Sequence, residues 1–106
     1  MKTKPENDTE LHDKINRETG RIEWSELERH FAQGNLVYVS EALDLIDVAV
    51  RISHDDKETI ARWMADGKLA RVSDLQAQTW SAAGAPLWAA VVHPFILVQP
   101  EKKQLH

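Results

Sequence analysis

Residues 54–56, His-Asp-Asp, form the densest group of side chains in this sequence that could bind a metal or exchange protons. An imidazole beside carboxylates can hold a divalent cation and activate water. The same residue types also begin helices. With Asp55 as the N-cap, Glu58 takes the third helical position, and negative charge lies where the helix dipole favours it. We therefore interpret this segment as a helix start capped by Asp55.

The other histidines give no stronger indication of a metal site. His-Asp dipeptides at residues 12–13 and 54–55 are similar to those of histidine–aspartate phosphohydrolases, but such enzymes need further ligands on a larger helical scaffold. No pair of histidines forms H-x-x-x-H, H-E-x-x-H or another dense ligand spacing. The histidines stand at positions 12, 30, 54, 93 and 106. We predict no metal and no cofactor.

Nucleophilic catalysis has no clear candidate either. The chain contains no cysteine, and no serine lies in a G-x-S-x-G motif. The four glycines all fall at predicted helix ends and not in a phosphate-binding loop. We predict no catalytic residue and favour a non-enzymatic role. A minor enzyme or small-ligand binder around His54 or His93 remains an alternative, since His93 lies in an apolar run just before Pro94.

Length and composition indicate one ordinary globular domain. Residues 8–99 carry the apolar pattern, and residues 1–7 and 100–106 are expected to be flexible termini. The net charge of −4 disfavours binding to nucleic acid or to anionic membranes. The absence of cysteine fits a reducing compartment. Because there is no signal-peptide pattern and no apolar run long enough to span a bilayer, we expect a cytoplasmic protein.

Periodicity and capping signals predict helices, one of which is ambiguous. The predicted helices cover residues 8–19, 25–33, 43–53, 55–66 and 73–83. Gly20 is expected to stop the first helix, and capping boxes are expected at residues 25–28 and 73–76. Residues 43–53 alternate as a strand does, but their polar side chains recur at three- and four-residue intervals. We therefore choose a helix there.

Two β segments complete the expected fold. Residues 36–39 read as a short strand, and residues 87–99 read as a β-rich segment that Pro94 bends or interrupts. The sequence therefore predicts an α+β domain with four or five short helices packed on a small, mostly antiparallel β-sheet.

Residues 57–72 are the basis of an alternative hypothesis for the function. A helix with a tryptophan, a glycine stop and a basic strand is similar to the helix-and-wing segment of excisionase-like DNA-binding domains. The phosphate contacts would be Lys57, Arg62, Lys68 and Arg71. Acids at positions 55, 56, 58, 66 and 74 surround these cations, which disfavours a nucleic-acid-binding regulator.

The favoured function is a non-catalytic module that binds a protein partner or forms a homo-oligomer. The candidate interaction surface is Trp88, His93, Phe95 and Ile96. Because few strands are available to cover one another, we expect residues 87–99 to carry unpaired strand edges, which proteins use for self-association or strand addition. The alternative is that these side chains simply face the helices.

Several separated motifs, taken together, resemble those of a known family. They are residues 22–27 (IEWSEL), 31–34 (FAQG), 43–49 (LDLIDVA), 63–67 (WMADG), 72–80 (VSDLQAQTW) and 91–99 (VVHPFILVQ). The chain resembles, over about residues 10–99, a family of small bacterial proteins of unknown function, number twenty-two eighty-eight in the domain-of-unknown-function series. The resemblance implies a stand-alone cytoplasmic bacterial domain with no assigned activity, cofactor or catalytic residue.

Overall fold

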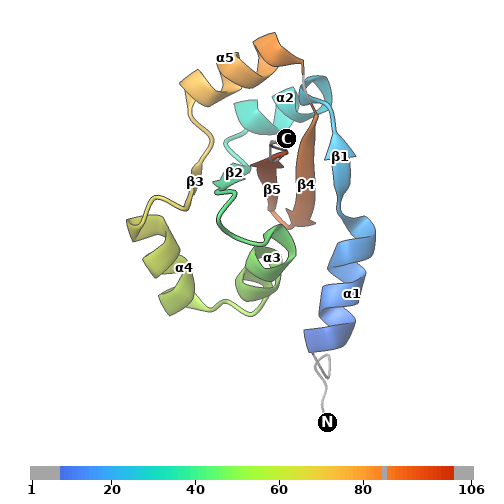
Figure 1. The fold of residues 1–106 in the computed structure, drawn as a ribbon, viewed down its shortest axis with the longest axis vertical. Helices are drawn as coiled ribbons and strands as arrows, with labels where there is room; N and C mark the ends of the chain where they lie inside the picture. The colour runs from blue at the N-terminus through green and yellow to red at the C-terminus, as the bar shows by residue number, and fades with distance from the viewer. Residues whose placement is uncertain (1–7, 85, 102–106) are drawn as a thin grey trace, which may run out of the picture.

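The computed structural model describes residues 8–84 and 86–101 (Figure 1). Its helices are α1 (Asp8–Glu18), α2 (Trp24–Ala32), α3 (Leu45–Ser53), α4 (Lys57–Ala65) and α5 (Asp74–Ala83). Its strands are β1 (Gly20–Ile22), β2 (Leu36–Val39), β3 (Leu69–Arg71), β4 (Leu87–Val92) and β5 (Phe95–Pro100). Of the termini predicted to be flexible, residues 1–7 and 102–106 lie outside the described residues, whereas Pro100 ends β5.

The strands form one sheet in the order β1-β4-β5-β2-β3. Antiparallel pairing joins β1 to β4, β4 to β5 and β2 to β3, and the central β2–β5 pairing is parallel. The turn at His93 and Pro94 folds residues 87–100 into a hairpin, so Pro94 marks a bend between two strands, one of the expected alternatives. The predicted α+β fold is therefore confirmed.

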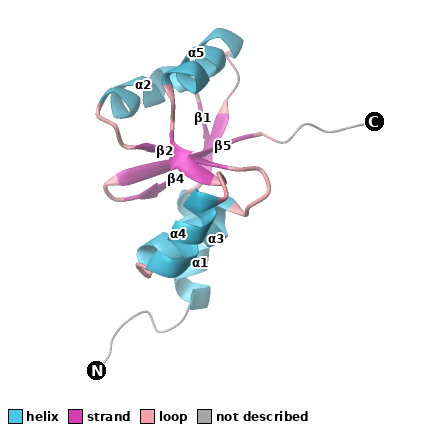
Figure 2. Ribbon diagram, turned by 90° about the vertical axis from the view of Figure 1, so that its left-hand side faces the viewer, coloured by secondary structure: helices cyan, strands magenta, loops and turns pink. Residues whose placement is uncertain are grey.

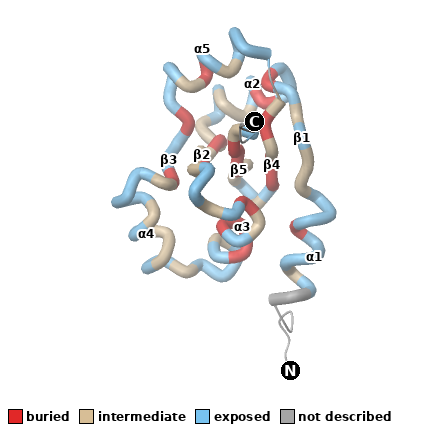
Figure 3. The backbone as a smooth tube through the Cα atoms, in the orientation of Figure 1, coloured by how far each residue is buried: buried red, intermediate tan, exposed pale blue. Residues whose placement is uncertain are grey.

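Helices cover both faces of the sheet (Figure 2). We call the two sides the α3 face, covered by α1, α3 and α4, and the α2 face, covered by α2 and α5. Each face has its own buried cluster, in which Leu97 of the α3 face and Leu27 of the α2 face are 0% exposed. Burying a side chain of this size stabilises a fold by roughly 1.5–3 kcal/mol. Figure 3 shows this burial concentrated in β4, β5 and α3.

Of residues 43–53, Leu45–Ser53 form α3, so the choice of helix over strand is confirmed. Asp44 caps this helix, because its Oδ1 accepts from the N–H groups of Ile46 at 2.9 Å and Asp47 at 3.1 Å. Val48 and Ala49 are fully buried against the sheet, and Asp47 lies in the exposed polar stripe. The helical spacing of polar residues was the informative signal.

Two expected helix boundaries are wrong. Gly20 does not stop α1 but pairs with Ala89 as the first residue of β1, a strand the sequence did not predict. Ser25 is not a cap, since α2 begins one residue earlier at Trp24 and the N-cap Glu23 makes no side-chain capping bond. Trp24 is 7% exposed, and its burial sets the helix start in place of a capping box. The predicted capping box at residues 73–76 is confirmed.

Candidate functional site

Residues 54–56 join α3 to α4. Asp55 adopts the left-handed conformation with φ of 57°; its N–H donates to Ile52 O, and the N–H of Asp56 donates to Arg51 O. This pair of bonds is the Schellman pattern that ends a helix. Asp55 therefore terminates α3, and the prediction that it caps the next helix is wrong by one residue.

Asp56 is the N-cap of α4. Its carboxylate accepts hydrogen bonds from the Thr59 N–H at 3.3 Å and from the Thr59 hydroxyl at 2.9 Å. The hydroxyl bond, the backbone bond and the nearby Arg51 guanidinium hold the pKa of Asp56 below its ordinary value of 3.8. The acids of this segment thus have structural roles, as the helix-start interpretation expected.

The four histidines in the described part of the chain do not converge on a metal centre. Within residues 8–84 and 86–101, no group of three or more His, Cys, Asp or Glu side chains is placed to hold a metal ion. His12, His54 and His93 are exposed, and His30 is half-buried. His106 lies outside the described residues.

Of the basic residues of segment 57–72, Lys57 and Arg62 lie on α4, Arg71 lies on β3, and Lys68 lies in the turn between them. Lys57 Nζ is 3.8 Å from the Asp55 carboxylate, and Arg71 Nη1 donates to the Gly34 carbonyl at 3.3 Å. Arg62 helps to lower the pKa of Asp56. These contacts weaken the case for a row of phosphate contacts.

The structure separates Trp88 from the other three residues of the candidate interaction surface, because His93, Phe95 and Ile96 line one hollow at the hairpin turn. Trp88 lies on the α3 face, half-buried, with the Arg21 guanidinium 5.4 Å from its ring centroid. His93 is exposed in the turn, and Phe95 and Ile96 are half-buried. The expectation of unpaired edges in this segment is wrong for residues 87–89, which pair with β1 and β5, and for residues 96–98, which pair with β4 and β2. Beyond Ala89, the register gives β4 no partner on its β1 side among the described residues.

Ile96 nevertheless lies in an open apolar groove, which we call the hairpin groove. It consists of two hollows of 420 and 230 Å³ that share His30, Val91 and Ile96 as lining residues. The first extends to His93 and Phe95 at the hairpin turn. Val91 is 45% exposed and belongs to neither buried cluster. The sequence did not single out His30 or Val91, because only the tertiary fold brings α2 beside the hairpin.

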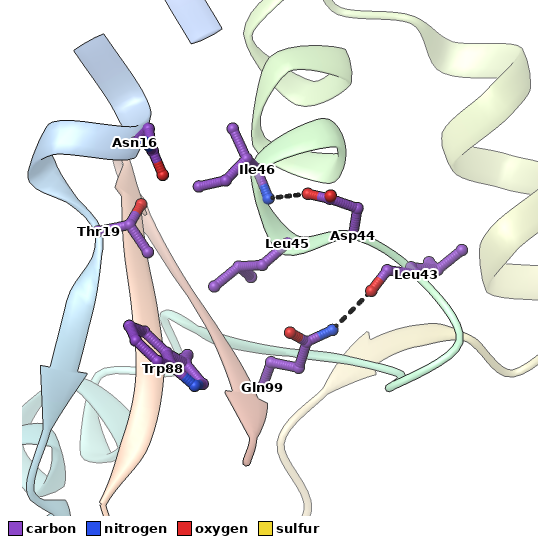
Figure 4. Close-up of a pocket in the computed structure, with 8 residues that line it drawn as sticks. All are labelled: Asn16, Thr19, Leu43, Asp44, Leu45, Ile46, Trp88 and Gln99. Atoms are coloured by element: carbon purple, nitrogen blue, oxygen red, sulfur yellow. Dashed lines mark hydrogen bonds between the residues drawn. The ribbon is translucent and has the colours of Figure 1, made fainter. Parts of the chain in front are cut away.

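A second cavity, the Trp88 pocket, lies on the α3 face and measures 280 Å³ (Figure 4). It is lined by Asn16, Thr19, Leu43, Asp44, Leu45, Ile46, Trp88 and Gln99. Gln99 is 9% exposed, and its Nε2 donates to the carbonyls of Ser40 and Leu43, both at 2.8 Å. Among these residues, Trp88 is the one that the sequence placed in the candidate interaction surface. For the other residues of the pocket, the available signal in the sequence was a polar Gln99 at the end of an apolar β run.

Together these features define a small α+β domain with an apolar groove on one face and a polar-lined pocket on the other. The chain belongs to the family described as "Protein of unknown function (DUF2288)", which it matches over residues 10–100. The resemblance read from the sequence motifs is therefore confirmed.

A solved structure has a similar fold. It is the NMR solution structure of PA1075 from Pseudomonas aeruginosa, which is 37% identical, with full coverage of both chains and a TM-score of 0.78. A search of curated proteins found no match. Within the described residues, no helix is long and apolar enough to cross a membrane.

Proposed function

We propose that this protein is a non-catalytic module that binds a short extended segment of a partner protein in the hairpin groove. The exposure of Val91, on a strand whose other residues are buried or half-buried, carries the proposal. An aliphatic side chain on an inner strand of a sheet normally lies under a helix, and here α2 leaves it open. An aliphatic side chain of a partner would bury Val91 and Ile96 together.

The size of the groove argues for a short segment and against a second folded domain. Each side of a standard protein interface uses roughly 20–30 residues, and far fewer line the two hollows. A stable dimer of this chain through the groove alone would therefore bury too little surface. The groove has polar groups at its rim, including Asn35 and His30, that can bond the backbone of an extended peptide.

The source and the cellular compartment of the module are inferred from its relative and its composition. The relative from Pseudomonas aeruginosa supports a bacterial source. The absence of cysteine from the sequence supports the reducing cytoplasm as its compartment. The bacterial source and the cytoplasmic compartment are both part of the proposal.

Selection from a random peptide library tests the proposal. Peptides that bind the wild type are expected to carry aliphatic residues, and Val91→Glu is expected to weaken them about tenfold or more, since it places a charge in the apolar contact. Leu75→Glu is the matched control, because Leu75 on α5 is 71% exposed and lines neither hollow. Enrichment of no peptide, or equal binding by the wild type and Val91→Glu, would count against the proposal.

A further inference from the structure

The Trp88 pocket is built around an oriented carbonyl oxygen. The two hydrogen bonds from Gln99 Nε2 to Ser40 and Leu43 fix the side-chain amide, so its Oε1 is held on the opposite side. Figure 4 shows this oxygen directed into the pocket between Trp88 and Leu45. Within the described part of the chain, no donor bonds it. A Gln99 side chain nine-tenths buried thus offers an unused acceptor to the cavity.

Asp44 and Thr19 also offer acceptors to the pocket, whereas the amide of Asn16 offers both an acceptor and donors. Asp44 brings a carboxylate, of which Oδ1 receives the capping bonds of α3 while Oδ2 makes no hydrogen bond to the described residues. The Thr19 hydroxyl gives its proton to Ile15 O at 2.7 Å, which leaves the oxygen lone pairs for a ligand. An anion would meet the Asp44 charge, and the N–H groups of Ile46 and Asp47 are already bonded. The pocket therefore suits a ligand that donates hydrogen bonds.

The apolar walls and the volume of the pocket determine the size and the non-polar part of the ligand. Leu45 and Ile46 of α3 face the indole ring of Trp88 across the cavity (Figure 4). Arg21, whose guanidinium lies 5.4 Å from the centroid of that ring, forms an ion pair with Glu101, so its charge is largely balanced. The volume of 280 Å³ lies just below the roughly 300–1,000 Å³ of drug-sized sites. It fits a small alkyl chain with one charged head.

We propose that the Trp88 pocket binds a small alkylammonium cation. The ammonium group donates to Gln99 Oε1, the Asp44 carboxylate in the wall of the same pocket attracts its charge, and the alkyl chain packs between Trp88 and Ile46. This site is on the opposite face of the sheet from the hairpin groove, so the two proposals stand or fall separately.

Titration with n-butylammonium, followed by NMR at the Trp88 indole N–H and the Gln99 side-chain amide, tests the site. Saturable shifts of both signals are expected, with butyrate and 1-butanol binding about tenfold more weakly because neither supplies a charge-assisted donor. Asp44→Asn keeps an effective N-cap but removes the charge, so it is expected to weaken butylammonium by about tenfold. Asp47→Asn, on the same helix but outside the pocket, is the control and should leave the affinity unchanged.

Three results would overturn the proposal. One is the absence of saturable binding by butylammonium. Another is butyrate or 1-butanol binding as tightly as butylammonium. The third is an equal loss of affinity in Asp44→Asn and Asp47→Asn, which would mean that only general surface charge attracts the cation.

Discussion

Gln99 Nε2 lies 2.8 Å from the carbonyl oxygen of Leu43, which is 56 residues earlier in the chain. The bond ties the end of β5 to the loop that leads into α3, and a second bond from the same nitrogen reaches Ser40. Gln99 is the buried polar residue of the described core. It therefore holds the loop before α3 and, with it, one wall of the Trp88 pocket.

Replacing Gln99 by leucine is expected to destabilise the fold. The carbonyls of Ser40 and Leu43 would lose their donor, and a buried polar group without a partner costs about 1–3 kcal/mol. Urea denaturation should show a loss of that size in the free energy of unfolding. Unchanged stability in Gln99→Leu would mean that water replaces the amide at no cost.

Asp56 is expected to stabilise the protein in a pH-dependent way. Asp56→Ala should lower the Tm by several degrees at neutral pH, because the Thr59 N–H and hydroxyl lose their acceptor. Since the folded pKa lies below 3.8, the contribution is present above that pH and is lost as the pH falls through the folded pKa. Thermal melts of both proteins from pH 7 to pH 2 should therefore converge at the acid end. A constant difference across that range would contradict this role.

Replacing Asp55 by glycine is expected to stabilise the protein, in contrast to the destabilisation expected for Asp56→Ala. Its φ of 57° is a conformation that glycine adopts without a steric penalty, so Asp55→Gly should raise the stability by about 0.5–1 kcal/mol. The exposed pair with Lys57 contributes little to offset this gain. Asp55→Val should lower the stability in the same denaturation assay. Destabilisation by glycine would show that the carboxylate matters more than the backbone conformation.

The two serines that the sequence treats alike are expected to differ. Ser73 accepts from the Gln76 N–H at 3.1 Å, so Ser73→Ala should cost about 0.5–2 kcal/mol. Ser25 lies exposed inside α2 and caps nothing, so Ser25→Ala should change stability by less than about 0.5 kcal/mol. Parallel urea titrations compare them directly, and equal losses would restore the capping box at residues 25–28.

Local signals in the sequence were enough to predict most helices and the hairpin at Pro94. The helix α3 was recognisable because its polar stripe is a property of neighbouring residues. By contrast, β1 forms because three residues pair with β4, and the sequence of residues 20–22 contains no local signal for that pairing. The cap position at Asp56 was missed because Asp55 and Asp56 are the same residue type, and only the end of α3 decides between them.

The candidate sites were harder to predict for the same reason. Trp88 and Ile96 were named as one surface, but strand alternation places them on opposite faces of the sheet. Trp88 lines a pocket with Gln99 and Asp44, and Ile96 lines a groove with His30, so each site combines residues from distant segments. Such a set depends on sheet order, which the sequence did not predict.

The most direct test of the hairpin groove is an NMR titration of the labelled wild-type protein with a library-selected peptide. The backbone amides of His30, Val91 and Ile96 are expected to shift together and saturate, while those of α4 stay unchanged. Shifts centred on α4 and β3, or a response to protein concentration alone without peptide, would contradict a partner segment in the hairpin groove.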